Sequence, residues 1–176
     1  MNVGRRYAKA LFQIAAEQNK IDQFMEELNL LKRFFDESSE CKTIFVDRLM
    51  EKEQKINIMS KICSRIELSE ETEKLLVLLI NGGREQIFNG IVMSYEQMYD
   101  DYKGIIKVDV YTAYDLVQEE IDTLKTRIKE MFNKDPVLHI IRDDYIIGGL
   151  KLKVGWTIYD GTIKTQLKDF TESIKI

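Results

Sequence analysis

The chain of 176 residues is poor in the residues that most often build catalytic and metal-binding sites: it has one histidine, two cysteines, one tryptophan and one proline. Because His139 is the single histidine, the sequence excludes a metal held by several histidines and a nucleophile assisted by a second histidine. We expect His139 to be an ordinary residue of a strand. Cys41 and Cys63 have no CxxC spacing, and we interpret them as free thiols in a reducing compartment.

Long apolar runs are also missing. The longest, Leu75 to Ile80, has six residues, whereas a membrane-spanning helix needs about 20. The first residues show no apolar segment of a secretory signal, and the net charge of -4 argues against a nucleic-acid binder. We therefore expect a cytosolic protein that binds no nucleic acid and reaches a membrane only through another protein.

Phosphate-binding motifs are absent as well, since the sequence contains neither GxxxxGK[ST] nor GxGxxG. The segment Gly82 to Arg84 has backbone N–H groups that could meet an anion, but such a glycine doublet more often ends a helix. The adjacent carboxylates at Asp100-Asp101 and Asp143-Asp144 do not converge on one bond as glycosidase carboxylates do. We therefore expect no catalytic, cofactor-binding or metal-binding residue, and a protein that is not an enzyme.

The first hundred residues instead show helical periodicity. Apolar side chains recur every three or four positions in successive segments that begin near Tyr7, Ile21, Ile56, Leu75 and Phe88. Ser38-Ser39 is suited to cap a further, short helix around Cys41 to Phe45. Ser69 is suited to cap the start of the next-to-last helix, and Gly82 is suited to cap its end. Six helices with short connections, and no proline before Pro136, predict an antiparallel six-helix bundle.

The pattern changes at Gly104. Ile106, Val108 and Val110 alternate with polar residues as in a strand, and helical spacing returns between Val117 and Phe132. Pro136 ends that helix, and Val137 to Ile141 is a second strand. The sequence predicts the α+β class, with a bundle in residues 1–104 and a small α+β domain, with a short sheet and two helices, in residues 105–176.

The stretch from Ile146 to Phe170 closes this second domain. Gly148-Gly149 changes the direction of the chain, and Leu150 to Val154 is a strand. Gly155-Trp156 is a tight turn that leads to a second, short strand, and a last helix follows. The apolar residues of that helix are Ile163, Leu167, Phe170 and Ile174. Because so short a stretch can hardly bury a core of its own, we expect upstream elements to cover it.

Four segments resemble the delta subunit of bacterial and chloroplast F-type ATP synthases, which is called the oligomycin-sensitivity-conferring protein in mitochondria. They are RRYAKALF (residues 5–12), LLINGGREQIF (78–88), VDVYTAYDL (108–116) and the closing IGG-x9-YDGTIKTQL (147–167). The resemblance covers essentially the whole chain in the right order. Two positions depart from the family pattern. Val117 stands where a capping Ser or Thr is usual, so we expect Asp115 to cap that helix instead. Trp156 replaces an acidic turn residue, which indicates either local packing or a contact surface.

The resemblance implies a non-catalytic stator subunit at the cytoplasmic face of the bacterial cell membrane, as a peripheral part of the ATP synthase complex. In this family the delta subunit ties the catalytic head to the peripheral stalk, so that the head resists the torque of the rotor during ion transport and ATP synthesis. The implied partners are the N-terminal helix of an alpha subunit and the C-terminal ends of the stalk b subunits.

The resemblance also implies the contact residues. In relatives the alpha-subunit helix lies in a groove between the first and fifth helices, a known recognition mode. The matching positions here are Tyr7, Ala8, Ala10, Leu11 and Ile14 with Leu75, Leu76, Leu79 and Ile80. Alternatively these residues form the core, and for Leu76 and Leu79 both interpretations stay open. The candidates for stalk binding are Lys151, Lys153, Trp156, Tyr159, Lys164 and Lys168.

Three interpretations compete. The stator hypothesis leads, and it requires association with membranes and a large ATPase. The chain could instead be a free-standing helical adaptor that binds amphipathic helical peptides, or a small ligase-like or nucleotide-binding enzyme that uses Gly82 to Arg84. The lysines at 151, 153, 164 and 168, with Arg142, form either a solvated face or a basic face for an acidic protein partner.

Overall fold

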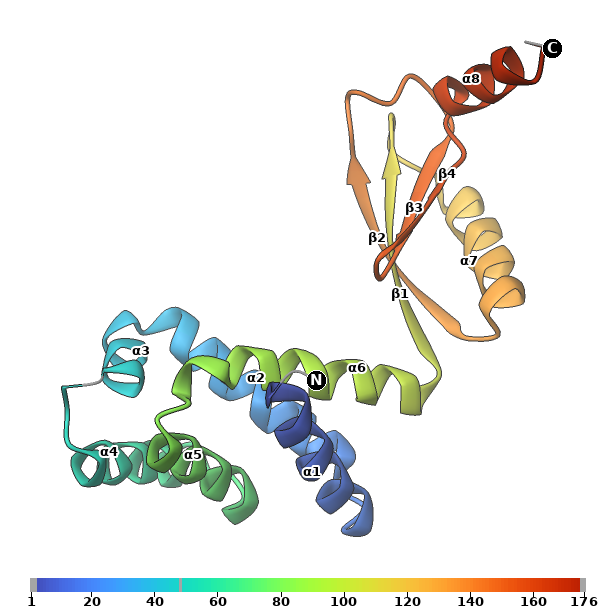
Figure 1. The fold of residues 1–176 in the computed structure, drawn as a ribbon. Coiled ribbons are helices and arrows are strands. Elements are labelled where there is room, and N and C mark those ends of the chain that lie inside the picture. Colours follow the sequence, from blue (N-terminus) through green and yellow to red (C-terminus); the bar gives the residue numbers. More distant parts are fainter. Residues whose placement is uncertain (1–2, 48, 175–176) are drawn as a thin grey trace. The chain divides into compact units, whose positions relative to one another are not determined.

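Figure 1 shows the computed structural model of the chain, which describes residues 3–47 and 49–174. These residues contain eight α-helices, one 3₁₀-helix and four β-strands, so the predicted α+β class is confirmed. The chain divides into two compact units, Met1–Tyr99 and Asp100–Ile176. The first unit is helical, and all four strands lie in the second.

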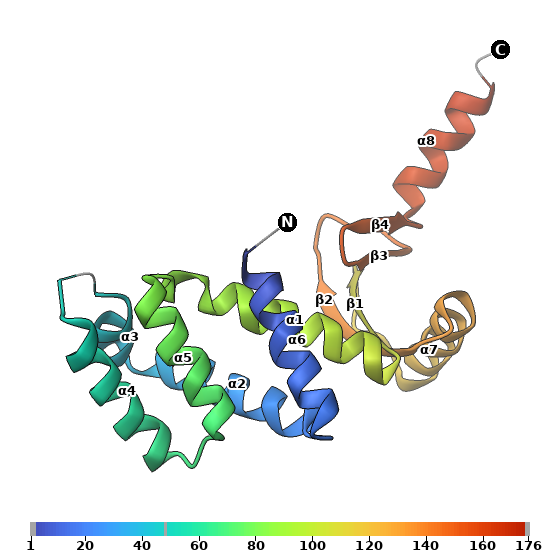
Figure 2. The ribbon, with the colours of Figure 1, turned by 60° about the horizontal axis from the view of Figure 1, so that its bottom comes forward.

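The first unit is built from short-linked helices, which Figure 2 shows from a second direction. They are α1 (Val3–Glu17), α2 (Ile21–Glu37), α3 (Ser39–Val46), α4 (Lys52–Arg65), α5 (Glu70–Gly82), the 3₁₀-helix η1 (Glu85–Ile87) and α6 (Phe88–Lys103). The last turn of α6 belongs to the second unit.

Side chains and glycine define the helix ends. Ser38 Oγ accepts from the Cys41 N–H at 3.3 Å and Ser69 Oγ accepts from the Thr72 N–H at 3.4 Å, so both predicted caps are confirmed. The predicted cap at Gly82 is wrong by one residue, because Gly83 is the residue that adopts the left-handed conformation, with φ +60°. The next N–H then reaches the carbonyl of Leu79 at 2.8 Å and closes the last turn of α5.

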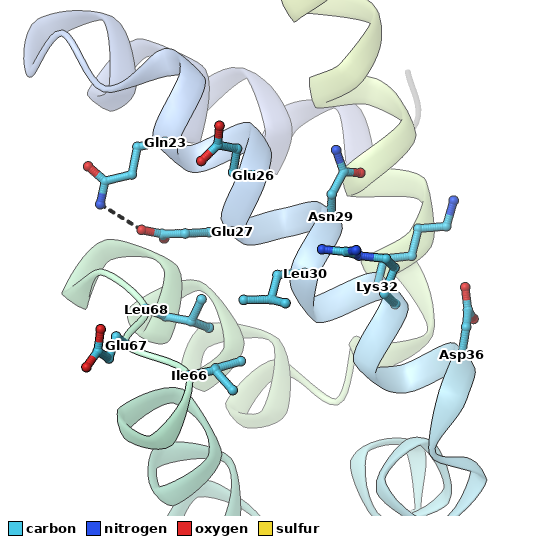
Figure 3. Close-up of a pocket in the computed structure, with 11 residues that line it drawn as sticks. Gln23, Glu26, Glu27, Asn29, Leu30, Lys32, Asp36, Ile66, Glu67 and Leu68 are labelled. Atoms are coloured by element: carbon cyan, nitrogen blue, oxygen red, sulfur yellow. Dashed lines mark hydrogen bonds between the residues drawn. The ribbon is translucent and has the colours of Figure 1, made fainter.

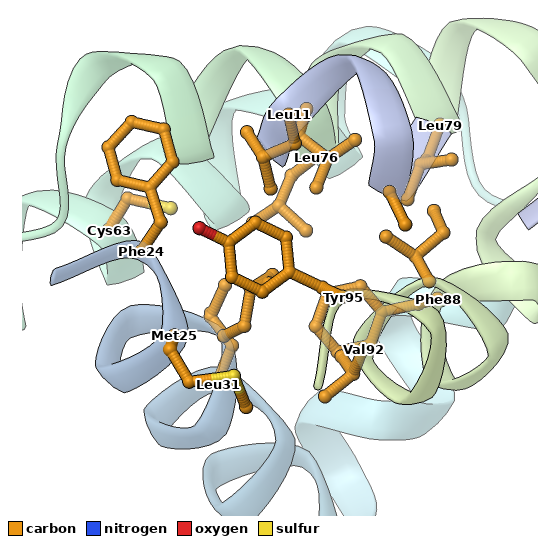
Figure 4. Packing of buried hydrophobic residues seen from close by; sticks show 14 of the residues in the cluster. Leu11, Phe24, Met25, Leu31, Cys63, Leu76, Leu79, Phe88, Val92 and Tyr95 are labelled. Carbon is orange, nitrogen blue, oxygen red and sulfur yellow. The ribbon is translucent and has the colours of Figure 1, made fainter. Parts of the chain in front are cut away.

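The helices α1 to α6 all contribute to one apolar core (Figure 4). Tyr95 of α6 lies in its middle, and its hydroxyl donates to the Ile21 carbonyl at 3.1 Å. Burial raises the pKa of Tyr95, so its phenol stays protonated. The rings of Phe35 and Phe45 stack with centroids 4.8 Å apart. Each apolar side chain that is fully removed from water contributes about 1.5–3 kcal/mol, so this core is the main source of stability in the first unit.

A buried ion pair crosses the same unit. Lys55 of α4 is 3% exposed, and its ammonium lies 2.7 Å from a carboxylate oxygen of Glu85 in η1. The ammonium also donates to the carbonyl of Asp47 at 2.6 Å. Because a buried charge without a partner is costly, these contacts hold α4 against η1 and the α3–α4 connection.

The second unit has the predicted order of strand, helix, three strands and helix. Its elements are β1 (Ile105–Thr112), α7 (Gln118–Phe132), β2 (Asp135–Arg142), β3 (Leu150–Val154), β4 (Thr157–Asp160) and α8 (Ile163–Ile174). The strands form one mixed sheet in the order β2-β1-β3-β4. β1 and β2 are parallel and joined through α7, whereas β3 is antiparallel to both β1 and β4.

The helix α7 packs on one face of this sheet, where Val108, Val110 and Ile128 form a small buried core. Because strand side chains alternate between faces, Lys107 and Asp109 of β1 lie on the opposite face, which we call the open face. The open face is defined by Lys107, Asp109, Tyr111, His139, Lys151, Lys153, Ile158 and Asp160.

The start of α7 differs from our expectation. Val117 is the N-cap residue, and Glu120 Oε2 accepts from its backbone N–H at 3.0 Å. The prediction that Asp115 would cap this helix is therefore wrong. A glutamate in the first turn can reach back to the N-cap residue, and this half of a capping box does not need a polar side chain at position 117.

The corner before β3 requires glycine. Gly149 has φ +84°, and a Cβ at this position would lie 2.5 Å from the carbonyl oxygen of Gly161. The backbone N–H of Gly161 in turn donates to the Leu150 carbonyl at 2.9 Å. The chain before β3 and the chain after β4 therefore touch without room for a side chain.

The last helix is not covered as we expected. Ile163, Leu167 and Phe170 are 47%, 60% and 64% exposed, and the side chain of Ile174 lies outside the described residues. The expectation that upstream elements would cover the closing stretch is confirmed for β3, because Leu150, Leu152 and Val154 pack against the core formed with α7. It is wrong for α8, because no described residue of that helix belongs to this core.

Candidate partner-binding surfaces

Two hydrogen bonds orient α1 against α5. Near the start of α1, the Tyr7 hydroxyl accepts from the Arg84 guanidinium at 2.9 Å, and Arg84 lies just beyond the end of α5. At the other end, the Gln18 amide donates to Glu71 in the first turn of α5 at 2.8 Å. The two helices therefore run antiparallel, with Tyr7 and Gln18 marking the ends of the region where they face each other.

The nine residues proposed for the alpha-subunit groove separate into two sets. Six of them are buried in the core of the first unit: Ala8, Leu11, Leu75, Leu76, Leu79 and Ile80. The other three, Tyr7, Ala10 and Ile14, are solvent-accessible. The segment Leu75 to Ile80 of α5 is apolar throughout, and its face with Leu76 and Leu79 is the one that packs into the core.

A further apolar residue faces this region. Leu78 is 58% exposed and lies two helical turns after Glu71, on the side of α5 that meets the end of α1. We name Tyr7, Ala10, Ile14 and Leu78 the α1–α5 surface. The uniform apolar pattern of α5 did not distinguish Leu78 from its buried neighbours, so the sequence alone did not identify it.

At the end of the α1–α5 surface near Glu71, hydrogen bonds and an ion pair hold the charged side chains in place. The hydrogen bond from Gln18 is the main cause that lowers the pKa of Glu71, which stays ionised. One turn further along, Lys74 forms an exposed ion pair with Glu70 at 2.7 Å, which raises the pKa of Lys74. These exposed contacts define charge positions more than they stabilise the fold.

A shallow pocket of about 880 Å³ lies between α2 and the α4–α5 connection (Figure 3). Its apolar part is formed by Leu30, Ile66 and Leu68, which point toward one another. At its edge the buried carboxylate of Glu27 accepts from the hydroxyls of Ser69 and Thr72, and thereby ties α2 to the start of α5. Because these bonds occupy Glu27, we assign it a structural role.

The six candidates for stalk binding do not form one patch. Lys151 and Lys153 lie on the open face, whereas Tyr159 pairs with Leu152 on the α7 side. The Tyr159 ring contacts the ring of Phe132 in α7, with centroids 6.0 Å apart. Trp156, in the β3–β4 turn, is 101% exposed, so local packing does not explain it.

Acidic residues partly neutralise the open face. Asp109 lies 3.3 Å from His139 Nδ1 and 3.9 Å from Lys153 Nζ. The Lys151 ammonium sits over the Tyr111 ring, 5.5 Å from its centroid. The predicted lysines therefore already have neighbours within their own domain, and His139 lies in β2.

Lys164 and Lys168 lie on α8 and are exposed. Lys168 makes an exposed ion pair with Glu172 at 3.8 Å. On the same helix, the apolar stripe of Ile163, Leu167 and Phe170 is exposed over its length. We name these three residues the α8 stripe. An exposed apolar stripe with a charged border is typical of a surface that binds another helix.

The chemistry available elsewhere is limited. Across residues 3–47 and 49–174, no three or more His, Cys, Asp or Glu side chains come together as metal ligands. Cys41 and Cys63 are unbonded thiols, and burial raises the pKa of Cys63 to about 11, which leaves it protonated at neutral pH. In the same described ranges, every helix is too short or too polar to cross a membrane.

Comparison with known families gives a match over nearly all of the chain. The family model described as ATP synthase delta (OSCP) subunit matches residues 3–174. The chain belongs to this family. Among its relatives, the ATP synthase subunit delta of Desulfosudis oleivorans is 32% identical over 173 residues, which cover 98% of this chain and 94% of that protein. The subunit delta of Trichlorobacter lovleyi is 32% identical over 165 residues, with 94% and 92% covered.

Solved structures show the same fold. A chain in the cryo-EM structure of the Toxoplasma gondii mitochondrial ATP synthase hexamer matches with a TM-score of 0.75 and 20% identity, and the match covers 98% of this chain and 97% of that chain. A chain in a structure of the Polytomella F-ATP synthase that focuses on the F1 head and rotor matches with a TM-score of 0.55 and 24% identity, over 58% of this chain and 90% of that one.

The four segments that resemble the delta (OSCP) family occupy defined places in this member. RRYAKALF lies in α1, and LLINGGREQIF runs from the end of α5 through η1. VDVYTAYDL forms the end of β1 and the loop after it, and the closing segment runs from the Gly148-Gly149 corner into α8. Each segment thus contributes either to the α1–α5 surface, to the sheet or to the start of α8.

Proposed function

We propose that this chain is a non-catalytic stator subunit of a proton-translocating F-type ATP synthase, which links the catalytic head to the peripheral stalk. The observation that carries the proposal is the family match over residues 3–174. A rotor driven by protons would turn the head unless the head were held. A subunit that holds it needs two separate binding surfaces, and this chain has exposed apolar groups in both of its units.

The first of these surfaces serves the head. In this proposal residues 1–104 form an antiparallel six-helix bundle, and the α1–α5 surface receives an amphipathic N-terminal helix of an alpha subunit. Support comes from the exposed side chains of Ile14 and Leu78, and from the antiparallel arrangement of α1 and α5. The six buried groove candidates support this surface from beneath.

The second surface serves the stalk. In this proposal residues 105–176 bind the C-terminal ends of the b subunits through the α8 stripe and Trp156 as apolar anchors. Lys164 and Lys168 would then lie at the border of the contact, where charges guide association more than they add affinity. The lysines of the open face, Lys151 and Lys153, are placed for an acidic segment of the same partner.

The location and the partners follow from this assignment. The subunit would lie at the cytoplasmic face of the bacterial cell membrane, and would reach the membrane only through the complex. It would bind no nucleic acid and no cofactor. We expect calorimetry with ATP or ADP at physiological concentrations to show no binding, and measurable affinity would count against the stator assignment and favour an enzyme.

The test of the head contact uses the full chain and a synthetic peptide with the N-terminal sequence of the alpha subunit from the same organism. Tyr7→Ala should weaken binding of this peptide by about 1–3 kcal/mol, the range of an interface anchor. Tyr114→Ala removes an exposed tyrosine of the other unit and should leave binding unchanged.

Melting followed by circular dichroism must accompany both titrations, because Tyr7 also packs against the core. A folded Tyr7→Ala variant that binds as tightly as the parent would remove Tyr7 from the contact. A parent chain that does not bind the peptide would remove the α1–α5 surface itself. A chain that binds amphipathic peptides but does not co-purify with an ATPase would instead fit the free-standing adaptor.

A further inference from the structure

Arg84 is held at the end of the α1–α5 surface by its backbone, so its side chain is not needed to shape the corner. The left-handed Gly83 turns the chain, and the Arg84 N–H bonds the carbonyl of Leu79 at 2.8 Å. The next residue, Glu85, is tied to Lys55 at 2.7 Å. The exposed Arg84 guanidinium is left to reach across to α1, where it donates to the Tyr7 hydroxyl at 2.9 Å.

This pair keeps unused hydrogen-bond donors. A guanidinium has five N–H groups, and the contact with Tyr7 uses only one nitrogen. Within residues 3–47 and 49–174, no carboxylate lies within ion-pair distance of Arg84, and no acceptor lies within hydrogen-bond distance of the Tyr7 hydroxyl hydrogen. Since the phenol oxygen accepts from Arg84, its own hydrogen is free to donate elsewhere. The pair thus presents a positive charge and several donors to solvent.

We propose that Arg84 and Tyr7 form a carboxylate-binding site at this end of the α1–α5 surface, which binds an acidic side chain of the docked helix. The inference rests on the proposed function, because it names what that surface recognises. A planar guanidinium matches a carboxylate with two parallel hydrogen bonds, and Tyr7 holds it beside the apolar groups of α1. Arg84 therefore determines specificity.

A carboxylate-binding site at one end would give the surface specificity for the register and direction of the docked helix, which apolar side chains alone do not provide. Ala10, Ile14 and Leu78 would accept any helix with an apolar stripe, in either direction and at several registers. A carboxylate bound at Arg84 fixes the register and direction of the docked helix, and it disfavours helices that leave the guanidinium without a partner. At the opposite end the surface meets the ionised Glu71, where a second acidic group would be repelled.

The experiment measures the affinity of the full chain for the synthetic alpha-subunit N-terminal peptide and for peptides in which each Asp or Glu is changed, one at a time, to Asn or Gln. Arg84→Ala should weaken binding of the unmodified peptide about 10-fold, the size of one charged hydrogen bond. Arg84→Lys should restore part of the loss, and Tyr7→Phe should weaken binding about 3-fold. Arg65→Ala, an exposed arginine in the last turn of α4, is the matched control and should have no effect.

The decisive result is the energetic coupling between Arg84 and one carboxylate of the peptide, measured by a double-mutant cycle. One peptide with a neutralised carboxylate should bind the parent about 10-fold more weakly and should lose nothing further with Arg84→Ala. The Arg84 side-chain N–H resonance should also shift when the unmodified peptide binds, and should not shift with that one peptide. A merely structural role of Arg84 would weaken every peptide equally and would overturn the proposal.

Other outcomes separate this inference from the function on which it rests. If the parent binds the peptide and Arg84→Ala binds it equally well, the carboxylate site is wrong and the α1–α5 surface stands. If the parent binds none of the peptides, both are wrong. Melting of each variant identifies any that fails to fold, and Tyr7→Phe, which keeps the ring and removes only the hydroxyl, then tests the site independently.

Discussion

Among the described residues, 20 apolar side chains are buried in the core of the N-terminal unit and 3 in the core of the C-terminal unit. The lengths of the two units, residues 1–99 and 100–176, differ far less than these two numbers of buried side chains. Several large apolar side chains of the C-terminal unit are instead exposed, namely the α8 stripe, Ile147 and Trp156. The N-terminal unit is therefore stabilised mainly by its own packing, whereas the C-terminal unit keeps apolar surface that only a partner can bury.

The polar contacts differ in the same direction. The N-terminal unit buries the Lys55–Glu85 pair and the carboxylate of Glu27. In the C-terminal unit, the pairs Lys129–Asp135 and Lys168–Glu172 join exposed side chains. An exposed pair contributes about 0–1 kcal/mol, whereas breaking a buried pair costs several times more. Charge removal should therefore damage the first unit selectively.

The largest effect should follow from Lys55→Ala. This change leaves Glu85 buried without its partner, and it should lower the free energy of unfolding by about 3–5 kcal/mol. Lys52→Ala is the matched control, because Lys52 lies on the same helix and bonds the Asn81 carbonyl at the exposed surface. Urea denaturation of the full chain measures both. Equal midpoints for the two variants would contradict the contrast between buried and exposed charges.

The next prediction compares the loss of unfolding free energy at a buried leucine, Leu76, with that at an exposed leucine, Leu167. Leu76→Ala creates a cavity in the core of the N-terminal unit and should cost about 2–5 kcal/mol of unfolding free energy. Leu167→Ala, in the exposed α8 stripe, should change it by no more than about 0.5 kcal/mol. The comparison also decides between the two interpretations of Leu76: a stable Leu76→Ala variant that fails only in peptide binding would make it a groove residue.

The exposed Leu167 should contribute to partner binding and not to the stability of the free chain. Leu167→Ala should weaken binding of a peptide from the C-terminal end of a b subunit by about 1–3 kcal/mol, as expected for an apolar anchor. Lys164→Ala, on the same helix, tests the border and should change binding by less than about 0.5 kcal/mol. Calorimetry with the full chain measures both. If Lys164→Ala has the larger effect, charge and not the apolar stripe carries the stalk contact.

Local patterns predicted much of the fold, because the deciding interactions lie close together in sequence. Ser38 and Ser69 accept bonds from residues three positions later, and the alternation in residues 106–110 describes one strand. The order of elements in the second unit followed from such signals. The cap of α7 was missed because Val117 has no acceptor, and Glu120 reached back from the first helical turn.

Burial was harder to predict than secondary structure. Leu76 and Leu167 both lie in apolar helical patterns, yet one is buried and the other is exposed. The difference depends on what packs against each helix, and that is a property of the tertiary structure. The burial of Lys55 and Glu27 was equally hard to predict, because charged residues usually lie at the surface. Both are buried here because residues far away in the sequence supply their hydrogen-bond partners.

The smallest effect concerns pH at the start of α8, the helix that lacks a covering core. Asp160 Oδ1 accepts from the Thr162 N–H at 3.0 Å, and this bond is the first cause that lowers the pKa of Asp160 below its ordinary value of 3.8. A carboxylate with a lowered folded pKa contributes its stabilisation fully above the unfolded value, and loses it as the pH falls through the folded value.

The amide resonance of Thr162 should therefore titrate with a midpoint below pH 3.8, the ordinary aspartate value. Asp160→Asn keeps an acceptor oxygen at the same place but cannot titrate, so its Thr162 amide should show no such shift. NMR of the full chain between pH 7 and pH 2 measures both proteins. A midpoint at or above 3.8 in the parent would show that the carboxylate is not held by this bond. The start of α8 would then rest on the Thr162 hydroxyl, which accepts from the Thr165 N–H at 3.4 Å, and on the Ile163 N–H, which donates to the Gly148 carbonyl at 3.0 Å.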